Sequence, residues 1–237
     1  MNHLIDECYD FLKDGGFPFA FCGGYAIELF LDKKVRSHGD IDISAFWEDR
    51  NAIIEYMQSN GWIVYEACGG GVVHFIDNID NQKYIKRNIF CVKTGCTFFR
   101  TRPCGEGMFK CEIDHIEQTK LDYIEFLFNT CNEKGFIYAR NNKIFRTLDK
   151  AIFRNNSIPY LSPELILLYK STDITRKGYQ LDFDVTVPHL SEESKQWLIN
   201  ALKIMYPDGH IWLSSLCKMN SVTGNDTKYF INRNEVR

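Results

Sequence analysis

The sequence predicts an α+β protein, because helical and strand-like patterns alternate near the N-terminal end and helical patterns alone follow near the C-terminal end. Between them, residues 69–118 are rich in Gly, Asn and Thr, and we expect an irregular antiparallel insert there. The character of the sequence changes near residue 147. We therefore expect an α/β domain over residues 1–146 and a mainly helical domain over residues 147–237.

The early elements follow from the spacing of apolar residues. A helix is expected where these residues recur every three to four positions, and a strand where they alternate or run together. Glycine pairs mark the ends of the first helix and the first strand. In order, the expected elements are a helix over 3–14, a strand over 17–22, a helix after Gly23-Gly24, a strand over 40–45, a helix over 48–59 and a strand over 62–67.

The later elements show β patterns first and helix-start signals afterwards. Ser162 is suited to an N-cap and is followed by Pro163 and an acid, so a helix is expected to begin there. Ser191, followed by two acids, begins a second helix that extends to about Met205. The strand candidates are 72–76, 88–93, 97–101, 121–128 and two short strands around Asn141-Asn142 within 135–145.

The composition excludes several classes of protein. With 28 Lys and Arg against 31 Asp and Glu, the formal net charge of -3 lacks the basic excess of proteins that bind nucleic-acid polymers, so we do not expect such a partner. No run approaches the roughly 20 apolar residues of a membrane span, and the first residues lack the layout of a signal peptide. Nine scattered cysteines suit reduced thiols. We therefore expect a cytoplasmic protein without a membrane partner.

Two carboxylates lie in a segment that otherwise resembles a buried strand. Asp40 and Asp42 alternate with Ile41 and Ile43, so the acids are expected to share one face while the isoleucines face the core. Two adjacent ionised acids repel each other unless a cation neutralises them. Ligands that offer only oxygen favour Mg²⁺ or Mn²⁺, and the pair therefore predicts a metal site.

The glycine pair before the acids predicts a phosphate site. At a turn from strand to helix, Gly23 and Gly24 let backbone N–H groups approach a ligand closely, and the positive end of the helix favours phosphate oxygens. Arg36 adds a charge-assisted contact to the same phosphates. His38 lies in the same motif and is assigned to nucleotide binding with them.

Together these motifs resemble a known family. The stretches CGGYAIELF (22–30) and RSHGDIDI (36–43) resemble the signature of the DNA polymerase β-like nucleotidyltransferase superfamily. Within it they are similar to the small aminoglycoside and lincosamide nucleotidyltransferases and their uncharacterised relatives. The resemblance covers about residues 17–213. It implies a polymerase β-like mixed sheet flanked by helices, with a helical C-terminal part.

The resemblance also implies further site residues. A third carboxylate on a later strand completes the metal site or acts as general base, and Glu125 in LDYIEFLF matches its position best. Asp122 is the rival, but three positions along a strand place it on the opposite face. Lys170 resembles a family lysine that approaches the nucleotide phosphates. Related chains often carry an acid near Gly178, for which Asp182 is the candidate substitute.

The implied function is metal-dependent nucleotidyl transfer. The enzyme transfers a nucleoside monophosphate to a hydroxyl of a small acceptor, such as an aminoglycoside or a lincosamide, and releases pyrophosphate. The donor is ATP, which supplies AMP, or another nucleoside triphosphate, which supplies the corresponding monophosphate. Two alternatives stay open: a non-catalytic nucleotide-binding or antitoxin-like module, and a nucleotidyltransferase that acts on a protein or RNA end. The intact acids argue against the first. The sequence leaves the acceptor, the preferred nucleotide and the oligomeric state open.

Overall fold

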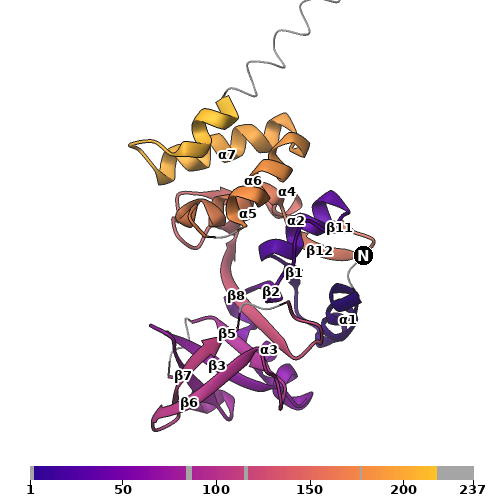
Figure 1. Ribbon diagram of the computed structural model, residues 1–237, viewed down its shortest axis with the longest axis vertical. Helices are drawn as coiled ribbons and strands as arrows, with labels where there is room; N and C mark the ends of the chain where they lie inside the picture. Colours follow the sequence, from indigo (N-terminus) through magenta and orange to yellow (C-terminus); the bar gives the residue numbers. More distant parts are fainter. Residues whose placement is uncertain (1–2, 84–86, 115–116, 177, 218–237) are drawn as a thin grey trace, which may run out of the picture. The chain divides into compact units, whose positions relative to one another are not determined.

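The computed structural model describes residues 3–83, 87–114, 117–176 and 178–217 (Figure 1). The chain divides into two compact units, Met1–Ile166 and Leu167–Arg237. In the described part of the chain, no helix is long and apolar enough to cross a membrane.

The first unit combines helices with all the strands of the described residues. Its helices are α1 (His3–Leu12), α2 (Gly23–Leu31), α3 (Arg50–Ser59) and α4 (Leu148–Ala151). Its strands are β1 (Phe19–Phe21), β2 (Asp42–Phe46), β3 (Ile63–Gly69), β4 (Val72–Ile76), β5 (Ile89–Val92), β6 (Phe99–Gly105), β7 (Met108–Ile113), β8 (Tyr123–Asn132), β9 (Gly135–Ile137), β10 (Phe145–Arg146), β11 (Ile152–Asn155) and β12 (Ile158–Leu161).

The second unit is helical. Helix α5 (Pro163–Lys170) leads into it from the first unit, and α6 (Tyr179–Thr186), α7 (Glu192–Met205) and a helical segment over residues 211–217 follow. The predicted helix starts at Pro163 and after Ser191 are confirmed, and the Ser191 side chain accepts a hydrogen bond from Ser194 N at 3.1 Å.

The strands form a mixed sheet. Within the described residues, ten strands lie side by side in the order β11-β12-β1-β2-β8-β5-β3-β4-β7-β6, while β9 pairs with β8 and β10. The pairs β1–β12 and β2–β8 are parallel, and the other neighbours are antiparallel. Helix α2 packs against β2 and β12, and α3 packs against β3. The predicted α+β class with a mixed sheet and flanking helices is confirmed.

The centre of this sheet is built from the segment that carries the acids. Ile41 and Ile43 are fully buried, as their alternation with the acids predicted. Ile43 pairs in register with Phe126 of β8, which is also fully buried. Burial of these side chains holds β2 and β8 together, so the polar residues that alternate with them must lie on the opposite face.

Three strands escaped the sequence analysis. One is β7, and the other two, β11 and β12, lie after residue 147, where helical patterns were expected to begin. These two form a hairpin through Asn156 and Ser157, whose φ angles are +47° and +75°. Two consecutive left-handed residues are the signature of a two-residue hairpin turn, which is usually marked by glycine. Asn-Ser lacks that mark, so the sequence pattern concealed the turn.

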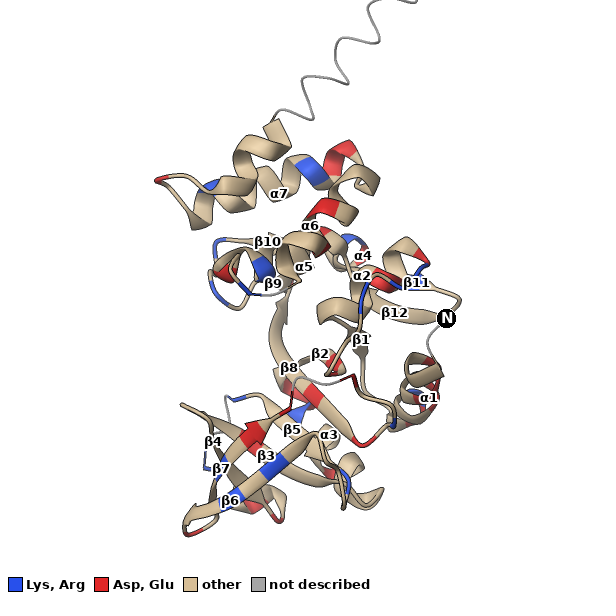
Figure 2. Cartoon of the chain, in the orientation of Figure 1, with Lys and Arg blue, Asp and Glu red and all other residues tan. Residues whose placement is uncertain are grey.

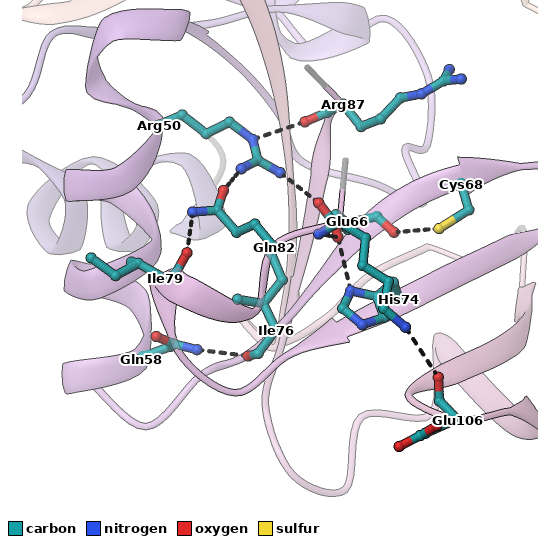
Figure 3. Close-up of polar contacts among 11 residues, drawn as sticks. Arg50, Gln58, Glu66, Cys68, His74, Ile76, Ile79, Gln82, Arg87 and Glu106 are labelled. Atoms are coloured by element: carbon teal, nitrogen blue, oxygen red, sulfur yellow. Dashed lines mark hydrogen bonds and ion pairs between the residues drawn. The ribbon is translucent and has the colours of Figure 1, made fainter. Parts of the chain in front are cut away.

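A buried polar network joins α3 to β3 and β4 (Figure 3). Glu66, with no exposed surface, accepts hydrogen bonds from the Arg50 guanidinium at 3.2 Å and from Lys83 N at 2.7 Å. His74 Nδ1 lies 2.8 Å from Glu66 Oε1, the same oxygen that accepts from Lys83 N. Gln82 also contacts Arg50. Because each buried charge has partners, the network fixes α3 on the sheet at β3 and β4.

Candidate active site

The turn between β1 and α2 presents backbone N–H groups. Cys22 is extended and Gly23 is left-handed, with φ of +62°, so the chain reverses sharply before the helix. Cys22 N donates to Asp42 O at 2.8 Å, which ties the turn to β2. The first N–H groups of a helix lack acceptors within the helix and lie at its positive end. This turn is therefore suited to an anion, and phosphate binding at Gly23 and Gly24 stays a prediction.

Both glycines are closely packed against candidate site residues. A Cβ atom on Gly23 would overlap the carboxylate of Asp42. A Cβ atom on Gly24 would overlap the His38 ring and lie 2.9 Å from Arg36 Nη2. The N-terminus of α2 thus gathers a carboxylate, an imidazole and a guanidinium in one place.

Asp42 and Glu125 lie side by side on two parallel strands. They are register partners of β2 and β8, and Glu125 N donates to Ile41 O at 2.9 Å (Figure 2, where the acidic segments of both strands are red). Register partners point to the same face of a sheet, so the two half-buried carboxylates share it. Asp40 lies two residues before Asp42 and outside β2. The strand was expected to begin at Asp40, but it begins at Asp42.

Asp122 occupies a different position. It precedes β8, its carbonyl oxygen accepts from Lys93 N at 2.9 Å, and its Oδ1 lies 3.5 Å from Gln118 Nε2. It has no register partner in β2. Of the two rival acids, the sheet brings Glu125 to Asp42.

Glu28 is a residue of this region that the sequence analysis missed. It is buried on α2, its Oε1 lies 3.0 Å from His38 Nε2, and it accepts from the backbone N–H groups of Val35 at 2.8 Å and Arg36 at 3.2 Å. Burial opposes its ionisation, but the hydrogen bonds from His38 and the two backbone groups outweigh burial and lower the pKa of Glu28. An acid among apolar residues four positions after Gly24 was the available signal.

His38 is therefore held from two sides. Its side chain is buried against Glu28, and its ring centroid lies 4.4 Å from that of Tyr25. Glu28 thus positions the loop from Val35 to His38 at the start of α2. The assignment of His38 and Arg36 to nucleotide binding stays a prediction.

Lys170 lies in the second unit. Its Nζ contacts Asp182 Oδ2 at 2.8 Å and lies 4.3 Å from the ring centroid of Tyr179, and both Lys170 and Asp182 are buried. Asp182, the candidate substitute for the acid near Gly178, is thus paired with Lys170. The role of Lys170 toward a nucleotide stays a prediction.

The three candidate carboxylates offer only oxygen atoms, a donor set that fits Mg²⁺ or Mn²⁺ and does not fit a thiolate-bound metal. Among the residues that the structure describes, no three His, Cys, Asp or Glu side chains are already gathered into a group that could hold a metal ion. Asp40, Asp42 and Glu125 stay the predicted ligands of such a cation.

Comparison with known proteins gives a family and a fold. The sequence model of the aminoglycoside-2''-adenylyltransferase family matches residues 4–125. No curated protein sequence matches the chain. The solution structure of the antibiotic-resistance factor ANT(2'')-Ia is similar, with a TM-score of 0.50 and 13% identity over 86% of this chain and 92% of that one. This similarity shows a shared fold.

Two further structures are more distant. Lincosamide adenylyltransferase LnuA with bound lincomycin has a TM-score of 0.43 and 13% identity over 85% of this chain and 96% of that one. ANT(2'')-Ia in complex with adenylyl-2''-tobramycin has a TM-score of 0.45 and 13% identity over 84% of this chain and 94% of that one.

Proposed function

Because the chain belongs to the aminoglycoside-2''-adenylyltransferase family and is a nucleotidyltransferase, we propose that it transfers AMP from ATP to a hydroxyl of a small acceptor and releases pyrophosphate. The observation that carries this proposal is the register pair of Asp42 and Glu125, with the turn at Gly23 packed against the Asp42 carboxylate. A phosphate-binding turn and an acidic pair then lie at one place. An aminoglycoside is the first acceptor to test, and a lincosamide the second.

The carboxylates would bind the metal. Asp40, Asp42 and Glu125 hold Mg²⁺ or Mn²⁺ in this proposal. When bound, such a cation offsets the charge of the triphosphate and lowers the pKa of the acceptor hydroxyl. Glu125 accepts the proton of the acceptor hydroxyl as the hydroxyl oxygen attacks the α-phosphorus. Pyrophosphate leaves as the bond between the α-phosphorus and the oxygen that bridges it to the β-phosphate breaks.

The other residues would position the nucleotide. Backbone N–H groups at Gly23 and Gly24 bind phosphate oxygens, and Arg36 and His38 contact the same phosphates. Lys170 offsets the charge of the phosphates as well. Catalysis then depends mainly on orientation and on fixed positive groups.

Replacement of one carboxylate by its neutral isostere tests the proposal. We expect wild-type protein with ATP, Mg²⁺ and a panel of aminoglycosides and lincosamides to release pyrophosphate with at least one acceptor. Asp42→Asn should lower kcat/KM by about 100-fold or more, because the cation that offsets the charge of the transition state loses a carboxylate ligand. Asp122→Asn is the matched control and should keep wild-type activity. Equal rates for Asp42→Asn and wild type would show that Asp42 does not serve the reaction.

The same assay separates the alternatives. A nucleotide-binding module without turnover would bind ATP with Mg²⁺ and release no pyrophosphate with any acceptor. An enzyme that acts on a protein or RNA end would transfer label from radiolabelled ATP to a macromolecule in cell extract. Either result would replace the small-molecule acceptor in the proposal.

A further inference from the structure

Tyr123 lies at the start of β8 with its ring immobilised. It is fully buried, and it lies two residues before Glu125, so both side chains point to the same face of the sheet. The ring centroids of Phe98 and Phe99 lie 4.9 and 5.7 Å from that of Tyr123, and that of Phe90 lies at 6.3 Å. These contacts fix the direction in which the phenol hydroxyl points.

The hydroxyl of Tyr123 has no hydrogen-bond partner among the described residues. Native proteins leave few buried polar groups unpaired, because each one loses its contact with water and gains nothing in return. In this cluster a phenylalanine would satisfy the packing equally well. The unpaired hydroxyl therefore indicates that a hydrogen-bond acceptor comes within reach when the arrangement of the site changes.

The position of Tyr123 in the sheet identifies that partner. Phe90, whose ring centroid lies 6.3 Å from that of Tyr123, is the register partner of Glu125. Of the three candidate carboxylates, Glu125 lies on the same strand and the same face as Tyr123. A phenol hydroxyl keeps its proton at neutral pH and can donate a hydrogen bond to a carboxylate oxygen.

We propose that Tyr123 is a positioning residue of the active site, whose hydroxyl donates a hydrogen bond to Glu125 when Asp40, Asp42 and Glu125 gather around a divalent cation. The inference rests on the proposed function, because it requires these carboxylates to bind the cation. In the described residues the carboxylates are not yet gathered, and the hydroxyl is not yet paired. Movement of the carboxylates toward the cation would both complete the metal site and give the Tyr123 hydroxyl its acceptor.

Tyr123→Phe removes the hydroxyl and keeps the ring. Tyr65→Phe is the matched control, since Tyr65 belongs to the same aromatic cluster and its ring lies 5.6 Å from Phe99. We would titrate Mn²⁺ by calorimetry into each protein in the presence of a non-hydrolysable ATP analogue, and measure the Tm of each metal-free protein. Outer partners of metal ligands typically change metal affinity by about 10- to 100-fold. We expect Tyr123→Phe to weaken Mn²⁺ binding at least about 10-fold with an unchanged or higher metal-free Tm, and Tyr65→Phe to leave Mn²⁺ binding unchanged.

The outcomes distinguish this inference from the proposed function. If wild type binds Mn²⁺ and Tyr123→Phe binds it equally well, Tyr123 has no positioning role and the proposed function stands. If Tyr123→Phe loses affinity together with several degrees of metal-free Tm, its hydroxyl is structural and the inference is wrong. If wild type binds no Mn²⁺ with the nucleotide analogue, the proposed metal site fails and the inference fails with it.

Discussion

At the scale of single residues, Gly23 and Gly24 have a second role besides exposing backbone N–H groups in the turn, because they leave space for neighbouring side chains. Gly23 needs a left-handed φ and also leaves space for the Asp42 carboxylate, while Gly24 leaves space for the His38 ring. Any side chain at Gly23 would meet both a strained backbone and an occupied volume. The glycines therefore set the distance between the helix N-terminus and the acids of the site.

Glu28 supports a prediction about pH. Its folded-state pKa is lowered, so ionised Glu28 contributes stability that is present above its unfolded pKa of about 4.3 and is lost as the pH falls through the lower folded value. Glu28→Gln should lower the free energy of unfolding at pH 7 by about 1 to 3 kcal/mol, because its buried donors lose a charged acceptor. Urea unfolding at pH 7 and at pH 3.5 measures the difference.

The difference between wild type and Glu28→Gln should narrow as the pH falls, since wild type alone loses the ionised group. Glu133→Gln, on an exposed turn, is the control and should change neither value. A constant gap between the two proteins over this pH range would contradict the assignment of the lowered pKa to the contacts of Glu28.

At the scale of elements, strand register brings together site residues from distant segments, and the sequence alone could not predict this pairing. One cross-strand row runs from Asp42 on β2 through Glu125 on β8, Phe90 on β5 and Tyr65 on β3 to Phe75 on β4. All five side chains share one face of the sheet. The carboxylates therefore adjoin an aromatic surface, which also holds the Tyr123 ring through Phe90. Period-two spacing identified the acids, and pairing of distant strands placed them.

Sequence patterns predicted the parts of the fold and site that depend on local spacing. The helix starts, the buried Ile41 and Ile43, and the family resemblance of the glycine turn are confirmed. The choice of Glu125 over Asp122 came from position in a motif, and the β2–β8 register now supports it. Contacts between a helix and the loop that follows it, such as Glu28 with His38, have no periodic signature, so the sequence could not reveal them.

The β11–β12 hairpin supports a prediction about stability. Ser157 has a φ of +75°, a conformation that costs a non-glycine residue roughly 1 to 2 kcal/mol, whereas glycine adopts it freely. Its side chain is exposed, so substitution disturbs no packing. Ser157→Gly should therefore raise the free energy of unfolding by about 0.5 to 1 kcal/mol, measured by urea denaturation. Ser157→Ala, which keeps the strain, should give no gain, and an equal gain in both variants would contradict the strain argument.

At the scale of the whole molecule, the family match and the two-unit division describe different lengths of chain. The family match covers residues 4–125, which include β2 and the first three residues of β8, whereas Lys170 lies beyond it in the second unit. Glu125 is the last residue of the match. The acids and the glycine turn thus lie both within the matched residues and within one unit, and the assignment of Lys170 rests on sequence resemblance.

Ligand binding should raise the stability of the molecule in a metal-dependent way. A ligand that binds the folded protein alone stabilises it by about 2.7 kcal/mol at 100 times its Kd, which corresponds to roughly 5 to 10 °C in Tm for a chain of this length. We expect a non-hydrolysable ATP analogue with Mg²⁺ to produce such a shift in wild type, measured by scanning calorimetry. The analogue with EDTA should produce a smaller shift, because the acids would then face the phosphates without a cation between them. In Asp42→Asn, addition of Mg²⁺ should bring little further gain; a full Mg²⁺-dependent shift in this variant would show that the cation binds elsewhere.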